Sequence, residues 1–228
     1  MSQNTSRWKT LILEGILIVF SILLAFSIDA WWDGQKVEQQ RIELLQALRD
    51  DFEQTSMALV AAVAEAKELE ERTGGFLTAV RTNSNIADDS LRLLFAGVGQ
   101  AAIYDPSIPS YQVAVATGRI ELVRSPRLIA ALAGFDLARS TYQLHLGVSA
   151  QLFYLDAVQD LRRAGVSLDT PGADRLYFEV PDGFDLRGHL ATSSAEPLYT
   201  VQRNIKENLV DMHSATVAIL EELDILLN

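Results

Sequence analysis

The 228-residue sequence contains no cysteine. This absence excludes disulfide bonds, thiolate zinc sites, iron–sulfur clusters and cysteine nucleophiles together. Histidine is also scarce, because only His145, His189 and His213 occur, and none of them belongs to a His-x₃-His or Glu-x-x-His pair. The signatures of zinc sites and di-iron helical bundles are therefore missing, and we expect neither a metal nor another cofactor.

Basic residues are also few: 19 Lys+Arg stand against 30 Asp+Glu, which gives a formal net charge of -11. Nucleic-acid binding depends on Lys/Arg clusters that neutralise phosphates, so we expect no nucleic-acid partner. No Walker loop or G-x-S-x-G elbow occurs. The letters of Gly97–Ala102 fit G-x-G-x-x-A, but a predicted helix precedes them, and a helix end is the simpler interpretation. With no convergent acid, base or metal set, the sequence does not predict an enzyme.

One long hydrophobic run is present, from Thr10 to Ile28, and it contains a single charged residue, Glu14. About 20 apolar residues, each rising 1.5 Å, cross a bilayer core of about 30 Å. Trp8 lies at one end of the run and Trp31 and Trp32 lie at the other, as in interfacial aromatic belts. The sequence predicts a short N-terminal tail (1–9), a transmembrane helix (10–32) and a soluble domain (33–228).

A cleaved signal peptide is the alternative, with Arg7 and Lys9 as its basic region and Ala25–Ser27 as its cleavage site. The length of the run, its interruption by Glu14 and the tryptophan pair that follows favour a retained span. We expect a single-pass protein, because no second run of this kind follows.

The charges beside the span predict its orientation. Arg7 and Lys9 precede it without any acidic residue, whereas Asp29, Asp33 and Lys36 mix both signs after it. Because positive charge favours the cytoplasmic side, we expect a cytoplasmic N-terminus and a C-terminal domain outside the cytoplasm.

Four residues of the span are candidates for contacts between helices within the membrane. Ser21 and Ala25 form a small-xxx-small pair, with Gly15 nearby, which permits close helix approach. An ionisable residue such as Glu14 inside a membrane is by default a functional hypothesis. Alternatively, Glu14 lies one turn inside the belt, where it reaches headgroup water or a neighbouring basic side chain.

The soluble part begins with a sequence typical of a long helix. Residues 36–72 are rich in good helix formers, and we expect Gly74-Gly75 to end the helix. Within it, apolar and small residues recur at alternating steps of three and four, which is a heptad pattern typical of coiled coils. The residues of this seam are Leu45, Leu48, Phe52, Thr55, Leu59, Ala62, Ala66 and Leu69.

Five further helices are expected, over residues 76–82, 88–95, 111–117, 126–164 and 194–226. The strongest signals are Ser125-Pro126, an N-cap followed by proline, and the capping-box spacing of Ser193 and Glu196. An apolar stripe in the last helix matches the seam in the first. We therefore predict an all-α fold: the transmembrane helix continues into a long helix of an antiparallel bundle, with an irregular region at about 165–195.

The irregular region contains Tyr177, Phe178 and Phe184, within and after a strand-like run at 176–180. Aromatic residues on a loop are typical of a partner surface, here at the distal end of the bundle. The alternative, which we favour, is that they form a plug that closes the end of the bundle as part of its own core.

The span and one later segment resemble a family of uncharacterised single-span bacterial membrane proteins. The similarity rests on Glu14-Gly15 before a β-branched run, on Ile28-Asp29-Ala30-Trp31, and on the turn Thr117–Val123 before a helix with Leu128 and Leu132. The sequence departs from the family pattern at Ser21, where a core glycine is usual, and at Phe26-Ser27, where Leu-Gln is usual. The resemblance implies a bacterial inner-membrane protein with a periplasmic helical domain, and no known activity.

These features favour a membrane-anchored helical scaffold or accessory protein. Its expected partners are the lipid bilayer and either a second copy of the chain or another membrane-protein subunit. Two alternatives stay open. One is an extracytoplasmic ligand-sensing domain that signals through a partner, and the other is an oligomeric ion-conducting assembly with Glu14 in its membrane seam.

Overall fold

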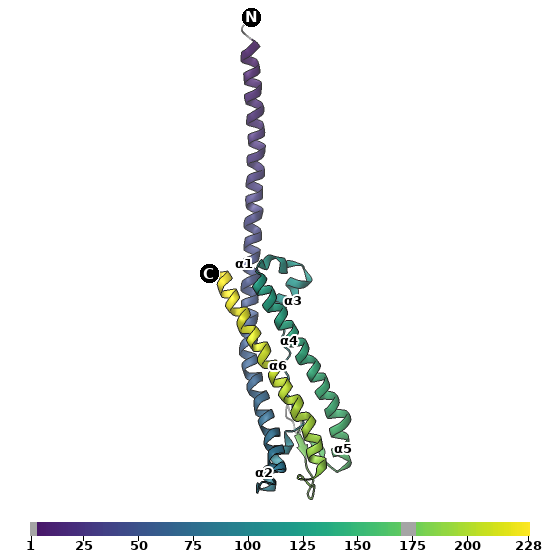
Figure 1. Ribbon diagram of the computed structural model, residues 1–228. Helices are drawn as coiled ribbons and strands as arrows, with labels where there is room; N and C mark the ends of the chain where they lie inside the picture. The colour runs from purple at the N-terminus through teal and green to yellow at the C-terminus, as the bar shows by residue number, and fades with distance from the viewer. Residues whose placement is uncertain (1–3, 170–176) are drawn as a thin grey trace.

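A computed structural model describes residues 4–169 and 177–228. One long helix projects from an elongated helical bundle, and the C-terminus lies at the end of the bundle from which this helix projects (Figure 1). The elements are α1 (Asn4–Arg81), α2 (Asp88–Ala96), α3 (Pro109–Ala116), the 3₁₀ helix η1 (Arg119–Val123), α4 (Pro126–Gln151), the π-helical turn η2 (Leu152–Ala157), α5 (Val158–Arg163), β1 (Ser167–Asp169), β2 (Tyr177–Glu179) and α6 (His189–Leu227). The prediction of an all-α fold is confirmed, and β1 and β2 add only a short antiparallel ribbon.

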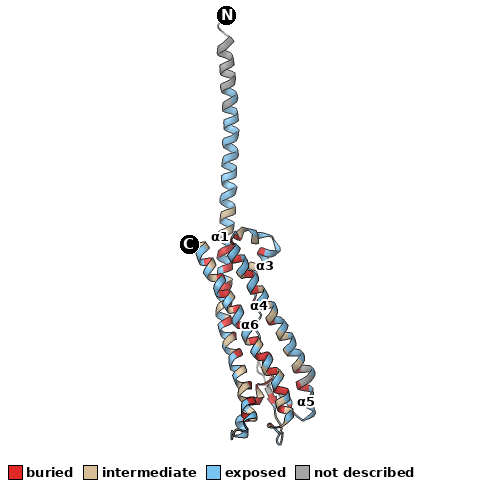
Figure 2. Ribbon diagram, viewed as in Figure 1, coloured by how far each residue is buried: buried red, intermediate tan, exposed pale blue. Residues whose placement is uncertain are grey.

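Helix α1 runs without interruption from the apolar segment into the bundle, through Gly34. From Leu17 to Lys36 its projecting part is exposed, as the pale blue ribbon in Figure 2 shows, and buried side chains begin at Leu44. By length and composition, this part of α1 is a candidate membrane span. A continuous helix therefore joins the candidate span to the packed domain.

The two apolar stripes predicted from the sequence pack inside the bundle. All eight residues of the α1 seam are buried, from Leu45 to Leu69, and so are those of the α6 stripe from Leu198 to Leu223. Helix α6 packs against both α1 and α4. The heptad seam of α1 is therefore covered by helices of its own chain.

The prediction that Gly74-Gly75 ends the first helix is wrong, because α1 continues to Arg81. A Cβ atom at Gly74 would lie 3.1 Å from Cε2 of Tyr199 on α6, so the glycine permits close helix packing. Beyond it, Phe76 and Leu77 are buried. Their burial stabilises the last turns of the helix, because tertiary packing outweighs the low helix propensity of glycine.

The last helix begins earlier than predicted, at His189 after an extended Gly188, and Pro197 lies inside it. Ser193 does not cap this helix, because its hydroxyl donates to the carbonyl of Leu190. By contrast, Ser125 does cap α4, and its Oγ accepts from the backbone N–H of Leu128 at 3.2 Å. Helix α4 then leads through η2 into α5, so the helix predicted over 126–164 contains a π-helical turn at 152–157.

The segment between α2 and α3 runs along the bundle without regular structure, and buried residues such as Val98 and Ala102 alternate in it with exposed ones such as Ile103. Its backbone carbonyls at Val98 and Gln100 accept from the amide of the buried Gln202, at 3.1 and 2.7 Å. The hydroxyl of Tyr142 donates to the carbonyl of Ala102 at 3.0 Å and accepts from the N–H of Tyr104 at 2.7 Å. Side chains of α4 and α6 thus satisfy backbone groups that would be costly to bury unpaired.

We predict that Tyr142→Phe destabilises the fold by about 2 kcal/mol, because it leaves a buried carbonyl and a backbone N–H without their partner. Tyr111→Phe is the matched control, since its hydroxyl lies on a part-buried surface bond to Asp136 and its loss costs about 1 kcal/mol or less. Urea unfolding in mild detergent measures both. Equal losses for the two variants would contradict the role of Tyr142.

A second prediction concerns Gly99, at which a Cβ atom would lie 2.1 Å from Cε2 of the buried Phe153. Gly99→Ala should therefore destabilise the protein by about 1–3 kcal/mol through overpacking. Gly134, in the middle of α4, has no atom within 4 Å of its ideal Cβ position. Gly134→Ala should be neutral or stabilise by about 0.5–1 kcal/mol, as thermal unfolding would show.

Candidate functional site

The span residues singled out from the sequence lie on the exposed part of α1. Glu14, Gly15, Ser21 and Ala25 are all exposed. At about 100° per residue, Glu14, Ser21 and Ala25 fall within about 40° of one another around the helix axis. Gly15 lies about 100° away from Glu14. We call the face formed by Glu14, Ser21 and Ala25 the span face.

Polar groups of the span are accommodated within the helix. The hydroxyl of Ser21 donates to the carbonyl of Leu17 at 2.8 Å, and that of Ser27 donates to Leu23 at the same distance. Such internal bonds let serine sit in a hydrocarbon environment. Trp31 and Trp32 are exposed at the end of the span, with ring centroids 5.3 Å apart. The side chain of the third predicted interface tryptophan, Trp8, lies outside the described residues.

The aromatic residues of the irregular region close the distal end of the bundle. Phe178 is buried, and its ring lies 5.6 Å from Phe95 and 5.7 Å from Phe153. Phe184 is half-buried against the same Phe95 ring, 6.1 Å away. The partner-surface interpretation therefore fails for Phe178, whose burial agrees with the plug. The side chain of Tyr177 lies outside the described residues.

A compact structure at the opposite end of the bundle lies beside the exit of α1. We call residues 109–130, which comprise α3, η1 and the start of α4, the shoulder (Figure 1). Polar contacts attach it to α1 and α6. On α1, Asp51 accepts from the backbone N–H of Ser110 at 2.8 Å, and Glu38 lies 3.9 Å from Arg124. On α6, Glu222 accepts from the hydroxyl of Ser125 at 2.9 Å. The shoulder therefore has a defined place on both α1 and α6.

Left-handed backbone conformations flank η1. Gly118 has φ +72° and Arg124 has φ +50°. Glycine accepts this conformation freely, whereas a residue with a side chain pays about 1–2 kcal/mol. The following Ser125 caps α4 and Pro126 begins it, which offsets the strain at Arg124. The chain thus turns sharply between η1 and α4.

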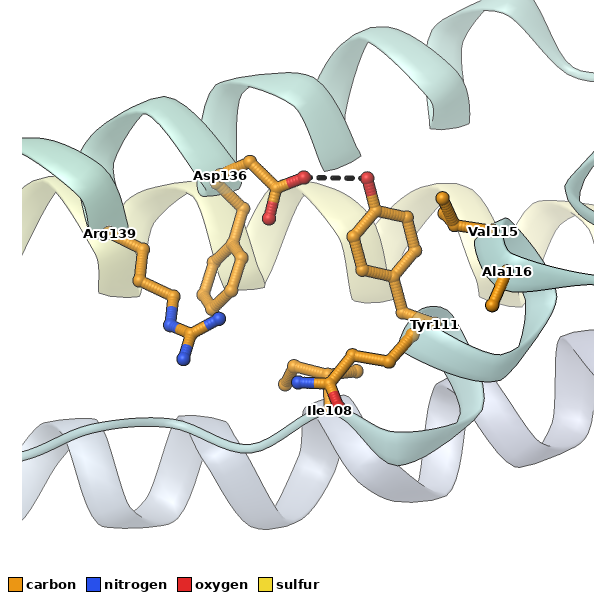
Figure 3. Close-up of a pocket in the computed structure, with 8 residues that line it drawn as sticks. Ile108, Tyr111, Val115, Ala116, Asp136 and Arg139 are labelled. Carbon is orange, nitrogen blue, oxygen red and sulfur yellow. Dashed lines mark hydrogen bonds between the residues drawn. The ribbon is translucent and has the colours of Figure 1, made fainter.

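A hollow of about 340 Å³ lies between α3 and α4 at the side of the shoulder (Figure 3). The Tyr111 hydroxyl donates to the Asp136 carboxylate at 2.7 Å. Arg139, on the same wall as Asp136, donates to Asp105 through Nε at 3.1 Å and Nη2 at 2.8 Å. Burial, and then the bond to Asp136, raises the pKa of Tyr111 to about 12.

The polar groups of this hollow are matched to one another, so the geometry favours a structural role over acid–base chemistry. Tyr111 stays protonated at neutral pH and holds Asp136, and Asp105 holds Arg139. Among the described residues, no group of three His, Asp or Glu side chains is placed to hold a metal ion. The side chains that line the hollow attach α3 to α4.

Sequence reasoning did not single out the shoulder as a site. Arg119 and Arg127 are exposed, and Arg124 extends toward Glu38 of α1. The signal that was available is a local excess of arginine in an otherwise acidic chain, between Pro109 and Ala130. Its meaning depends on the fold, because only the fold places this segment next to the exit of α1.

Comparison with known proteins gives one match. A model of a family of unknown function, DUF6090, matches residues 14–153, which is more than half of the chain and extends from Glu14 to the start of η2. No curated protein matches. No solved structure matches.

The raised pKa of Tyr111 predicts a pH dependence of stability. Folding favours the protonated phenol, so the stabilisation from this group is complete below about pH 10 and is lost as the pH rises to about 12. Tyr111→Phe should therefore be less stable than the wild type at pH 8 and closer to it at pH 11. Burial raises the pKa of Tyr104 and Tyr142 as well, so part of the alkaline loss persists in the variant. A stability difference that does not change with pH in urea unfolding would contradict this.

Proposed function

The chain belongs to the DUF6090 family of unknown function, and we propose that it is a non-enzymatic, membrane-anchored accessory protein that binds its partner through the span face of α1. One observation carries the proposal. The apolar part of α1 is exposed along its whole described length, whereas the apolar seam farther along the same helix is buried against α6, with Phe135 of α4 in contact with Phe52. The exposed half is thus the part of α1 with apolar surface to cover.

A bilayer covers such a surface, and it also favours helix pairing at small residues. Lipid tails are as apolar as leucine, so helices associate in a membrane through close backbone approach and polar contacts. The span face offers both, with Ser21 and Ala25 as the small pair and Glu14 one heptad before Ser21. Glu14 gains most from a partner, because an ionisable residue in a membrane is costly without one.

The soluble domain contributes a rigid body to this arrangement. Its long helices bury their apolar stripes against one another, so the core of the bundle is formed by the chain's own residues. Because α1 is a single helix from Asn4 to Arg81, the bundle is held at a constant distance and angle to the span. A scaffold or accessory subunit needs this property, and we propose a second copy of the chain as the first candidate partner. In keeping with the charges that flank the span, we place the bundle on the periplasmic side of a bacterial inner membrane.

The absence of cysteine allows a direct test in the full chain, because a single introduced thiol has no competitor. Ser21→Cys and Ala25→Cys should each form a disulfide-linked dimer in native membranes treated with a copper–phenanthroline oxidant. Leu23→Cys is the matched control, because it lies about 180° around the helix from Glu14. We expect at least severalfold more dimer from the two span-face variants than from the control.

Two results would contradict self-association through the span face. Equal cross-linking of all three variants would indicate random collision, and no cross-linking in any would indicate a monomer. Adducts of Ser21→Cys with a second membrane protein, in place of the dimer, would identify a different subunit as the partner.

A further inference from the structure

We propose that the shoulder, residues 109–130, docks on anionic phosphate headgroups of the membrane that holds α1. The inference rests on the proposed membrane anchor. It assigns a ligand class, the phosphates of acidic lipids, to a surface of the bundle that lies outside the span. Four observations carry it: the charge of the shoulder, the exposure of its arginines, its height above the span and its attachment to the long helices.

Charge is segregated along the chain. The shoulder contains Arg119, Arg124 and Arg127 against one acidic residue, Glu121, which is a net charge of +2. The whole chain carries -11, so the other residues carry -11 minus +2, or -13. An acidic membrane surface attracts basic side chains near it and repels acidic ones. The shoulder is therefore a part of the bundle that such a surface attracts.

The arginine side chains are available for phosphate. Arg119 and Arg127 are exposed and have no ion-pair partner within 4.0 Å among the described residues. The Arg124 side chain is 59% exposed and lies 3.9 Å from Glu38, which already binds Arg41 at 2.8 Å. Guanidinium groups suit phosphate, because their parallel N–H donors match its oxygens.

The height of the shoulder agrees with the position of the headgroups. Arg124 lies beside Glu38, which follows Trp32 by six residues, or about 9 Å along the helix axis. Tryptophans at the end of a span sit at the headgroup level. A long arginine side chain bridges the remaining distance, and the usual tilt of about 20° for membrane helices brings one side of the bundle closer.

The shoulder is presented as a fixed surface. Asp51 of α1 and Glu222 of α6 hold its two ends through Ser110 and Ser125. Between them, the left-handed residues Gly118 and Arg124 turn the chain on either side of η1, and this segment lies at the end of the bundle from which α1 projects. Figure 2 shows this end as largely exposed ribbon.

The test uses the full chain in vesicles, with separate reporters for the anchor and for the shoulder. All three tryptophans, Trp8, Trp31 and Trp32, flank the span, so quenching of their fluorescence by brominated lipids reports insertion. Ala116→Cys, at the exposed end of α3, carries a bimane label that nitroxide-headgroup lipids quench only when the shoulder is docked. Vesicles of pure phosphatidylcholine are compared with vesicles that also contain phosphatidylglycerol.

We expect tryptophan quenching in both kinds of vesicle, but bimane quenching only with phosphatidylglycerol. The bimane signal should be lost in 1 M salt, where the Debye length falls to about 3 Å. In the Ala116→Cys background, the triple variant Arg119→Gln, Arg124→Gln, Arg127→Gln should lower the ratio of docked to undocked protein by on the order of 100-fold. The matched control, Arg162→Gln, Arg163→Gln, Arg203→Gln, removes the same charge from other exposed positions and should retain docking.

The outcomes separate the two proposals. Tryptophan quenching without bimane quenching in acidic vesicles would overturn shoulder docking and leave the anchor intact. Equal bimane quenching in both lipid mixtures would overturn recognition of phosphate charge. No tryptophan quenching in either would overturn the anchor itself. Circular dichroism of the two triple variants confirms that they are folded, so loss of docking in both would also count against the proposal.

Discussion

The fold depends on the irregular segment that runs from α2 to α3 along the bundle and buries about every second residue. An irregular segment in such a place carries backbone groups that helices would otherwise satisfy internally. The side chains of Gln202 and Tyr142 supply the missing hydrogen-bond partners. Each of them makes two hydrogen bonds to backbone groups of the segment. The buried residues of this segment thereby join the core formed by α1, α4 and α6, and its far end leads to α3, and with it the shoulder, beside the exit of α1.

Helix α1 has two different parts, one buried in the bundle and one exposed. In the bundle, its apolar seam is buried chiefly against α6, with Phe135 of α4 in contact with Phe52, so folding covers it completely. Before Leu44, the described side chains are exposed or only partly buried. In the proposed arrangement, the first part of α1 lies in lipid, and the rest of the helix lies in water together with most of the acidic residues of the chain. The basic shoulder lies at the boundary between them.

Most of what could be predicted about the fold came from local sequence patterns within single helices. The seam from Leu45 to Leu69, the α6 stripe and the cap at Ser125 depend on neighbours within one helix, and all three were predicted correctly. The predicted helix end at Gly74-Gly75 was wrong because Gly74 packs against Tyr199, which is distant in the sequence. The shoulder could not be predicted for the same reason. Glu38 and Arg124 are 86 positions apart in the sequence, and no pattern in either segment indicates that they lie close together. The span face, by contrast, follows from helical spacing alone.

The continuity of α1 sets an angular relation between its two ends. From Ala25 to Leu45 is 20 residues, about 200° around the helix, and from Ala25 to Leu48 is about 140°, so the span face and the seam lie about half a turn apart. Whatever contacts Ser21 and Ala25 is thus on the side of α1 away from its own bundle. Two copies joined there would stand back to back, with their first helices at the centre and their bundles outward. Each shoulder would then face lipid beside the pair, where the other copy does not reach.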